Sequence, residues 1–249
     1  MFKPSRYLGP VISTLLVVLP AAAAQGEQTG APRWSITPYI WATETSVDLA
    51  FRDADIGTGE ISFGDLLDVL DAAFMIHVEG GGGNWSAFGD LTYLETSDTD
   101  QRTLFTLDTD SEQLILDAGV GYWPGGAGSN LSLIGGLRYT SFDDRYTFLV
   151  DDEELGRLRT SNDYYDALLG VRYRWDMSER WALLTHADFS FGDSEGTYLL
   201  RANFAVTVGA RRQNRILFGY QYMVAEFEDG DVTSDYRYQG PMAGFNFRW

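Results

Sequence analysis

The chain offers few residues that could carry out chemistry, and the most suggestive pair is His186 and Asp188. With no Cys and only two His residues, His77 and His186, the sequence excludes disulfides, thiolate zinc sites and Cys nucleophiles. Positions i and i+2 of a β-strand point the same way, so His186 and Asp188 could act as an imidazole base oriented by a carboxylate. No Ser stands at a spacing typical of lipases or deacylases. A structural role for His186 and for His77 is therefore the favoured interpretation.

Overall charge and composition exclude other classes of protein. With 18 Lys and Arg against 36 Asp and Glu, the 249-residue chain has a formal net charge of −18, so a nucleic-acid partner is not expected. At 45% hydrophobic and 14% aromatic residues, the chain is too apolar to remain disordered. Beyond residue 24, no uninterrupted apolar stretch approaches the length of a membrane-spanning helix. Any membrane crossing must therefore use β-strands.

Residues 1–24 have the layout of a secretory signal peptide. Lys3 and Arg6 precede an apolar run at residues 11–19, and small residues follow at 21–24. The run is shorter than the roughly 20 residues that cross a bilayer as a helix. We expect cleavage after Ala24, a short N-terminal segment at 25–32 and one domain at 33–249.

Strict alternation of apolar and polar residues dominates the remaining chain. It recurs in ten segments, at 34–42, 72–79, 85–93, 113–123, 131–140, 165–175, 181–191, 198–208, 216–224 and 243–249. A period of two is typical of a strand with one face in lipid and the other toward a lumen. The phase slips near residues 239–241, where Tyr236 and Tyr238 have the opposite parity, and a β-bulge is expected there.

The lengths of the connections orient the predicted barrel. Short turns at 80–84, 124–130, 176–180 and 210–214 alternate with longer polar loops at about 50–71, 98–111, 149–161, 193–196 and 229–235. The pattern predicts a ten-stranded antiparallel transmembrane β-barrel with short periplasmic turns and longer extracellular loops. Six of the seven Trp residues fall at the short-turn ends of strands, where indole favours the membrane interface. This predicted aromatic girdle comprises Trp34, Trp85, Trp123, Trp175, Trp181 and Trp249.

The last five residues, Phe245-Asn246-Phe247-Arg248-Trp249, resemble the terminal aromatic signature of bacterial outer-membrane proteins. The chain after residue 24 is similar to uncharacterised proteobacterial outer-membrane β-barrel proteins. This resemblance implies an outer-membrane location, in contact with outer-membrane lipid and lipopolysaccharide. It also implies that the barrel-assembly machinery is a partner, with Phe245, Phe247 and Trp249 as the assembly signal.

The inward positions of the predicted strands carry a mixture of acids and arginines that could pair with one another. Arg suits such a network because it stays charged and can engage a carboxylate through two hydrogen bonds. Ten strands enclose a narrow lumen, so a structural network is favoured over a path for small ions or solutes. The predicted lumen network comprises Glu79, Asp90, Asp117, Arg138, Asp166, Arg172, Arg174, His186, Asp188, Arg201 and Arg248.

A barrel hydrolase is the enzymatic alternative. Ten-stranded outer-membrane proteases use Asp and His pairs near the outer rim, and His186 with Asp188 would be the candidate pair. A second acidic pair would have to face them, and the sequence does not fix where Asp143 and Asp144 lie. No complete catalytic constellation can be assembled, so a non-enzymatic protein, serving envelope structure or surface interaction, is the favoured hypothesis. A narrow channel and the hydrolase are the alternatives, and the sequence leaves the oligomeric state open.

The predicted outer loops are strongly acidic. Such oxygen-rich clusters could hold Ca²⁺ or Mg²⁺, but none has EF-hand spacing, so solubilising surface charge is favoured and no cofactor is expected. Within loop one, segment 61–71 spaces Phe63, Leu66 and Leu70 at helical intervals behind a capping pair, Ser62 and Asp65. A short helical lid is expected there, and capping of the barrel mouth is favoured over contact with lipid or with an external partner.

Overall fold

The computed structural model describes residues 33–51, 54–101, 106–126, 129–150, 153–209, 214–229 and 232–249. The predicted signal peptide at 1–24 and the segment 25–32 lie outside the described residues. Within the part that the structure describes, no helix is long and apolar enough to cross a membrane.

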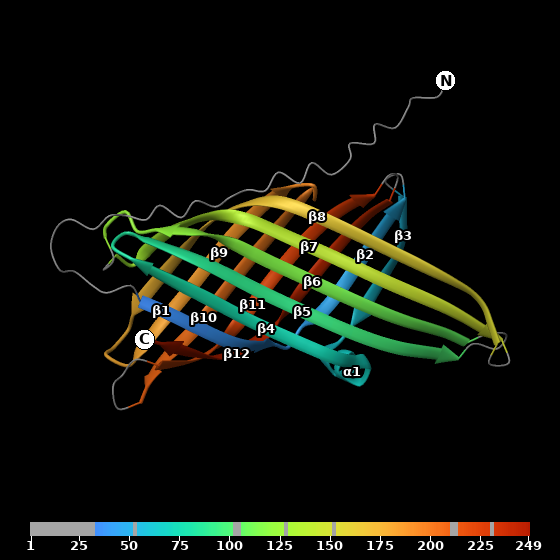
Figure 1. Ribbon diagram of the computed structural model, residues 1–249, viewed down its shortest axis with the longest axis horizontal. Helices are drawn as coiled ribbons and strands as arrows, with labels where there is room; N and C mark the ends of the chain where they lie inside the picture. Colours follow the sequence, from blue (N-terminus) through green and yellow to red (C-terminus); the bar gives the residue numbers. More distant parts are fainter. Residues whose placement is uncertain are drawn as a thin grey trace, which may run out of the picture.

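The described chain forms one continuous antiparallel sheet that closes on itself (Figure 1). Around the wall the strand order is β1-β4-β5-β6-β7-β8-β9-β10-β11-β12, and β12 pairs back onto β1. The strands are β1 (Arg33–Trp41), β2 (Glu44–Phe51), β3 (Ala54–Ile61), β4 (Leu70–Gly82), β5 (Trp85–Gln101), β6 (Thr106–Tyr122), β7 (Leu131–Val150), β8 (Glu153–Asp176), β9 (Trp181–Gly192), β10 (Gly196–Val208), β11 (Asn214–Asp229) and β12 (Val232–Arg248).

Strands β1 and β2 together form a single wall strand against β12. Trp41 pairs with Met242 and Glu44 pairs with Gln239, so the register is the same on both sides of the short break. The wall therefore has ten strands, and the predicted ten-stranded closed barrel is confirmed. Strand β3 is additional, because it forms a hairpin with β2 beyond the start of β4.

The alternation in the sequence separates an apolar exterior from a polar interior. Leu137 and Leu169 on β7 and β8 are each 58% exposed on the outside, whereas Arg138, the next residue after Leu137 on β7, is 1% exposed. Large apolar side chains are exposed in the same way on all ten wall strands. Since these side chains have no protein neighbours to cover them, the exterior is suited to hydrocarbon rather than to water.

Parts of four predicted loops are in fact strands: residues 54–61 form β3 and residues 232–235 begin β12. Residues 98–101 and 106–111 belong to β5 and β6, and residues 149–150 and 153–161 belong to β7 and β8, so the prediction of long acidic loops is wrong for these segments. Outside lipid, a strand can be polar on both faces and still pair its backbone with its neighbours, so alternation does not reveal it. In Figure 1 the ends of β5–β8 extend together, away from the ends of β2, β3, β11 and β12.

The predicted bulge near residues 239–241 is also wrong. The β11–β12 pairing runs without a shift from Arg215–Asn246 to Asp229–Val232. Tyr238 therefore lies on the same side of β12 as Met242, and both are buried inside the barrel. The change of parity in the sequence reflects an aromatic interior at this level rather than an irregular strand.

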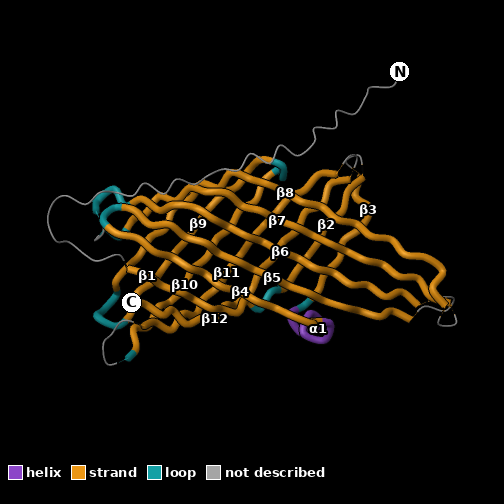
Figure 2. The backbone as a smooth tube through the Cα atoms, viewed as in Figure 1, coloured by secondary structure: helices purple, strands orange, loops and turns teal. Residues whose placement is uncertain are grey.

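A short helix, α1 (Phe63–Val69), precedes β4 as predicted (Figure 2). Ser62 caps it, because its Oγ accepts a hydrogen bond from the Asp65 backbone N–H at 3.2 Å. Leu66 is buried, whereas Leu67 on the next position is about half exposed. The helix lies against β2 and β5 at the end of the barrel where β4 begins.

Candidate functional site

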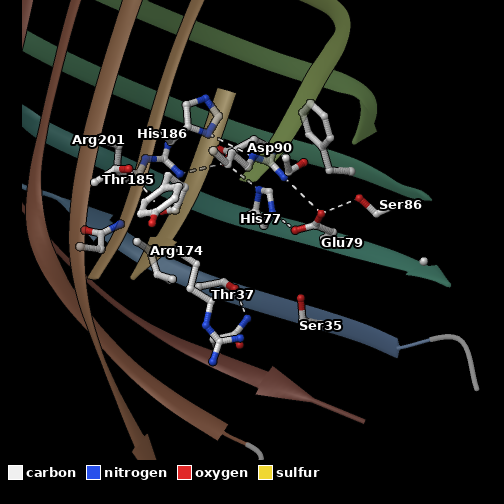
Figure 3. A pocket seen from close by; sticks show the side chains of 18 of the residues that line it. Ser35, Thr37, His77, Glu79, Ser86, Asp90, Arg174, Thr185, His186 and Arg201 are labelled. Carbon is white, nitrogen blue, oxygen red and sulfur yellow. Dashed lines mark hydrogen bonds and ion pairs between the residues drawn. The ribbon is translucent and has the colours of Figure 1, made fainter. Parts of the chain in front are cut away.

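The lumen contains a cavity of about 780 Å³ that reaches the end of the barrel where the short turns lie (Figure 3). Its mouth is lined by Gly81 and Gly82 at the end of β4, Gly83 in the β4–β5 turn, Asn130 before β7 and Arg215 at the start of β11. Its deep end is lined by Tyr39 and Asp90, together with other polar side chains of the wall strands. This cavity and the polar network at its deep end form the candidate functional site.

A buried arginine holds two carboxylates at the deep end of the cavity. Arg138 on β7 donates from Nε and Nη2 to the two oxygens of Asp117 on β6, each at 2.7 Å. The same Nη2 lies 3.1 Å from Asp188 Oδ1 on β9. The Arg138 side chain is fully buried, so this ion triad is shielded from solvent and its members depend on one another.

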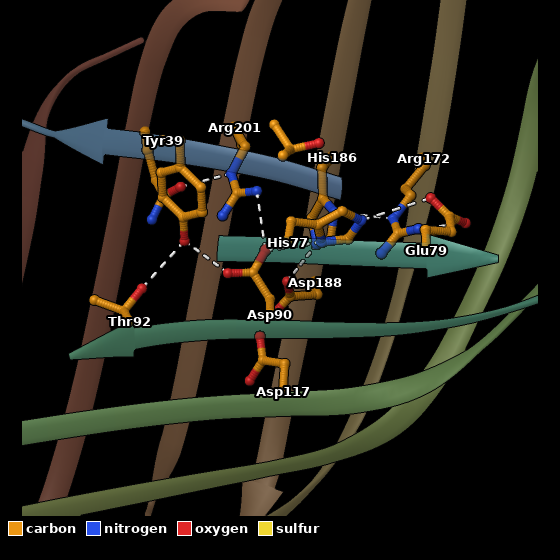
Figure 4. A network of polar contacts seen from close by, with 12 residues as sticks. Tyr39, His77, Glu79, Asp90, Thr92, Asp117, Arg172, His186, Asp188 and Arg201 are labelled. Atoms are coloured by element: carbon orange, nitrogen blue, oxygen red, sulfur yellow. Dashed lines mark hydrogen bonds and ion pairs between the residues drawn. The ribbon is translucent and has the colours of Figure 1, made fainter. Parts of the chain in front are cut away.

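A second group of contacts surrounds Asp90 on β5 (Figure 4). Tyr39 donates its hydroxyl to Asp90 Oδ1 at 2.6 Å, and His77 Nδ1 lies 3.0 Å from Asp90 Oδ2. Arg201 approaches the same oxygen at 3.4 Å and donates from Nε to Gln221 Oε1 at 2.5 Å. These contacts join strands on opposite arcs of the barrel and fix the side chains in place.

A third pair lies nearer the cavity mouth. Arg172 Nη1 donates to Glu79 Oε1 at 3.2 Å, and Ser86 Oγ donates to the same oxygen at 2.7 Å. The Arg172 guanidinium also lies 4.3 Å from the ring centre of Phe88, within range of a cation–π contact. Each cavity-lining carboxylate thus has a cationic partner.

Both ring nitrogens of His186 are engaged by protein groups. Nδ1 accepts a hydrogen bond from Arg172 Nε at 3.2 Å, and Nε2 lies 2.5 Å from Asp188 Oδ2. These contacts assign the proton to Nε2, which donates to Asp188. A general base needs a free lone pair within reach of a substrate proton. His186 offers none, and its geometry is that of a structural residue.

The second acidic pair that a barrel protease would need does not face His186. Arg138 contacts Asp188, the partner of His186, and therefore marks the level of His186 on β7. Asp143 lies five residues beyond Arg138, which at about 3.3 Å per residue is roughly 16 Å along the strand. Arg159 binds Asp143 on the outer extension and holds the pKa of that carboxyl below its ordinary value. Asp144 accepts from Ser111 Oγ at 2.5 Å. The sequence could not place these residues, because their distance from His186 depends on the register of the barrel.

Three residues of the predicted lumen network lie apart from its centre. Asp166 accepts hydrogen bonds from the backbone N–H and the hydroxyl of Ser194, at 3.0 and 2.6 Å, and so fixes the β9–β10 turn. Arg174 pairs with Asp176 at 2.7 Å near the cavity mouth. Arg248 also lines the cavity close to the mouth.

The outer half of the lumen is filled by apolar side chains, which the sequence interpretation missed. The rings of Tyr164 and Phe227 pack at 4.4 Å between centres, and Phe142 stacks on Tyr236 at 5.3 Å. A neighbouring void of about 20 Å³ has room for one water molecule. The plug comprises Tyr39, Trp41, Met75, Tyr164, Leu199, Met223, Ala225, Phe227, Tyr238 and Met242, with Ile115, Phe142 and Tyr236 packed against them.

Five of the predicted girdle residues point outward at the short-turn end. Trp34, Trp85, Trp175, Trp181 and Trp249 are all between 42% and 66% exposed. Trp123 differs, because it is only partly exposed. Two backbone hydrogen bonds of 3.1 Å join Trp34 and Trp249 and close the β1–β12 seam.

Ca²⁺ or Mg²⁺ at the acidic segments is the weaker alternative that the sequence leaves open. Across the described ranges, no group of three or more Asp, Glu or His side chains is arranged to hold an ion.

A closed antiparallel barrel with an apolar exterior and a polar lumen is the architecture by which strands cross a membrane. Solved structures with a similar fold include Ail, the attachment invasion locus protein of Yersinia pestis, at a TM-score of 0.40 and 10% identity over 88% of this chain and all of that chain. The outer membrane protease OmpT of Escherichia coli matches at a TM-score of 0.47 and 9% identity, over 88% of this chain and 97% of that chain. The outer membrane protein OprG of Pseudomonas aeruginosa matches at a TM-score of 0.31 and 13% identity, over 88% of this chain and 94% of that chain. No protein-family model and no curated protein matches the sequence. The fold therefore rests on the strand pairing of the chain itself.

Proposed function

We propose that the chain spans the bacterial outer membrane as a sealed barrel that displays its acidic strand extensions at the cell surface. The apolar exterior supports a lipid environment, which in the outer membrane includes lipopolysaccharide in the outer leaflet. Short turns lie on the periplasmic side of such barrels, so the cavity would open toward the periplasm and the long hairpins would face outward.

The observation that carries this proposal is the apolar plug. A channel needs a continuous polar path, and here the path ends where Tyr238, Met223 and Phe227 fill the lumen. The hydrolase alternative loses support because both nitrogens of His186 are occupied. What the barrel presents to its surroundings is then its exterior, its inner cavity and its outer hairpins.

The outer hairpins are long enough to form a rigid surface beyond the membrane. Strands β7 and β8 contain 20 and 24 residues, whereas about 9–11 residues cross a bilayer. Asp98 and Asp100 on β5 and Asp108 and Asp110 on β6 lie on the neighbouring extension. Backbone pairing with adjacent strands holds this acidic sheet, which favours a cationic partner surface through electrostatic complementarity.

A conductance measurement tests the proposal. In planar bilayers the wild-type protein is expected to show no unitary conductance, because the plug leaves space for about one water molecule. Replacing plug side chains in the double variant Phe227→Ala, Tyr238→Ala should produce measurable channel events. Heat-modifiable migration on a gel confirms that the variant is a folded barrel. Steady conductance by the wild-type protein would contradict the sealed lumen and support the channel alternative.

A further inference from the structure

The cavity at the short-turn end has the properties of a small-molecule site. Its volume of about 780 Å³ falls within the range of about 300–1,000 Å³ that is usual for ligand pockets. The plug closes it on the outer side, so it is a blind pocket rather than a pore. The hydroxyl side chains of Ser35, Thr37 and Thr185 line it (Figure 3). The amides of Asn203 and Asn246 also line it, alongside aromatic rings.

The charges in the cavity are arranged unequally between its deep end and its mouth. Arg138 and Arg201 pair with the carboxylates at the deep end, Arg172 pairs with Glu79 nearer the mouth, and Arg174 pairs with Asp176. Arg215 lines the mouth, and its guanidinium makes no hydrogen bond or ion pair with any described residue. A partly buried guanidinium without a counter-ion favours an anion, and its planar donors match a phosphate.

An unpartnered amide lies in the cavity wall on the neighbouring strand. Asn203 on β10 is 5% exposed, and its Oδ1 has no hydrogen-bond partner among the described residues. It pairs in register with Gly219 on β11, the strand that also carries Arg215. Asn203 Oδ1 is enclosed by the wall, but no hydrogen bond to a described residue fixes the side-chain amide, so the amide can rotate to meet a ligand hydroxyl in the cavity and recover the free energy that an unpaired buried polar atom costs.

From these features we propose that the cavity binds a phosphate-bearing, hydroxyl-rich molecule of sugar size. The phosphate pairs with Arg215 at the mouth, and hydroxyl groups bond to Asn203 and to the neutral polar side chains of the wall. Two sources share this chemistry: a soluble sugar phosphate and the headgroup of a phospholipid in the adjacent leaflet. The pocket's shape and charges carry this inference, which does not depend on the display of the outer hairpins.

The absence of Cys from the sequence allows a direct occupancy measurement. In the variant Ser35→Cys, the only thiol lies in the cavity wall, and its rate of reaction with a small thiol reagent reports access to the pocket. Glucose 6-phosphate at ten times its dissociation constant should slow labelling roughly elevenfold, since only the unoccupied protein reacts. Glucose without phosphate should leave the labelling rate near its starting value.

Two matched controls separate binding from general effects. Arg215→Gln in the Ser35→Cys background should remove the protection by glucose 6-phosphate, whereas Arg180→Gln should retain it. Arg180 is an exposed arginine at the same end of the barrel that does not line the cavity, so both changes remove one positive charge. A thiol on the outer extension, in Thr160→Cys, should react at the same rate with and without the ligand.

Lipid nanodiscs distinguish the two sources. Slower labelling in phosphatidylglycerol than in phosphatidylcholine, lost in Arg215→Gln, would identify a headgroup as the source, and protection by glucose 6-phosphate alone would identify a soluble ligand. Either result supports the proposal. It is overturned if neither phosphate probe slows labelling, if glucose protects equally, or if Arg215→Gln retains full protection. Conductance by the wild-type protein would instead overturn the sealed lumen, so the two failures are distinguishable.

Discussion

Deleting Phe247, Arg248 and Trp249 is expected to remove nearly all of the protein from the outer membrane. The deletion takes away the paired backbone hydrogen bonds between Trp34 and Trp249 and the register partners of Ser35 and Ile36 on β1. In hydrocarbon, the freed backbone groups of β1 would have no water to bond, at a cost of several kcal/mol each. The deleted residues include Phe247 and Trp249 of the proposed assembly signal. The deletion should therefore impair both recognition by the assembly machinery and closure of the barrel, and the two losses should add.

The matched control removes three residues, 151–153, from the connection between β7 and β8. Val150 and Glu153 form the last pair of the β7–β8 ladder, so this deletion removes only one residue that is paired in the sheet. Outer-membrane abundance and resistance to added protease are compared for the two truncations in one host. Similar abundance of both proteins would show that the terminal strand is not the assembly signal. It would also be evidence against the β1–β12 seam being needed to close the barrel.

Replacing Arg138 with Met should destabilise the folded barrel by about 3–5 kcal/mol, because it leaves buried charges without their partner. Asp117 and Asp188 both depend on this one guanidinium, whose side chain is fully buried. The measurement is the free energy of unfolding in urea, with the protein in lipid vesicles. Neutralising both acids as well, in Arg138→Met with Asp117→Asn and Asp188→Asn, should recover much of the loss.

An exposed arginine provides the comparison for this prediction. Arg159→Gln breaks the ion pair with Asp143 on the outer extension, where solvent screens the charges, and should cost at most about 1 kcal/mol. If Arg138→Met costs no more than Arg159→Gln, the buried ion triad does not stabilise the lumen in the way its geometry indicates.

The sequence predicted the part of the fold that lipid constrains. A strand that faces hydrocarbon must be apolar at every second position, so the ten wall strands and their phase were visible in segments such as 131–140 and 165–175. Beyond the membrane this constraint ends, and the polar continuations of β7 and β8 resembled loops. The length of these strands could not be predicted because backbone pairing leaves no pattern in the side chains.

The lumen was predictable in composition but not in arrangement. Inward parity placed Arg138, Asp117 and Asp188 on one face, yet which acid meets which arginine depends on barrel register and tilt. The plug was missed for a different reason. Tyr236 and Tyr238 did show inward parity, but an apolar residue at a lumen position contradicts the alternation rule and was attributed to a bulge.

The central claim is that the chain crosses the outer membrane with its hairpins outside and its cavity mouth in the periplasm. Single thiols in this Cys-free sequence test both sides in one measurement, using a membrane-impermeant maleimide on intact cells. Thr160→Cys, on the outer extension of β8, should be labelled in intact cells. Asn84→Cys, in the β4–β5 turn at the cavity mouth, should react only after the outer membrane is permeabilised. Labelling of Asn84→Cys but not Thr160→Cys in intact cells, or protection of both thiols, would contradict the account.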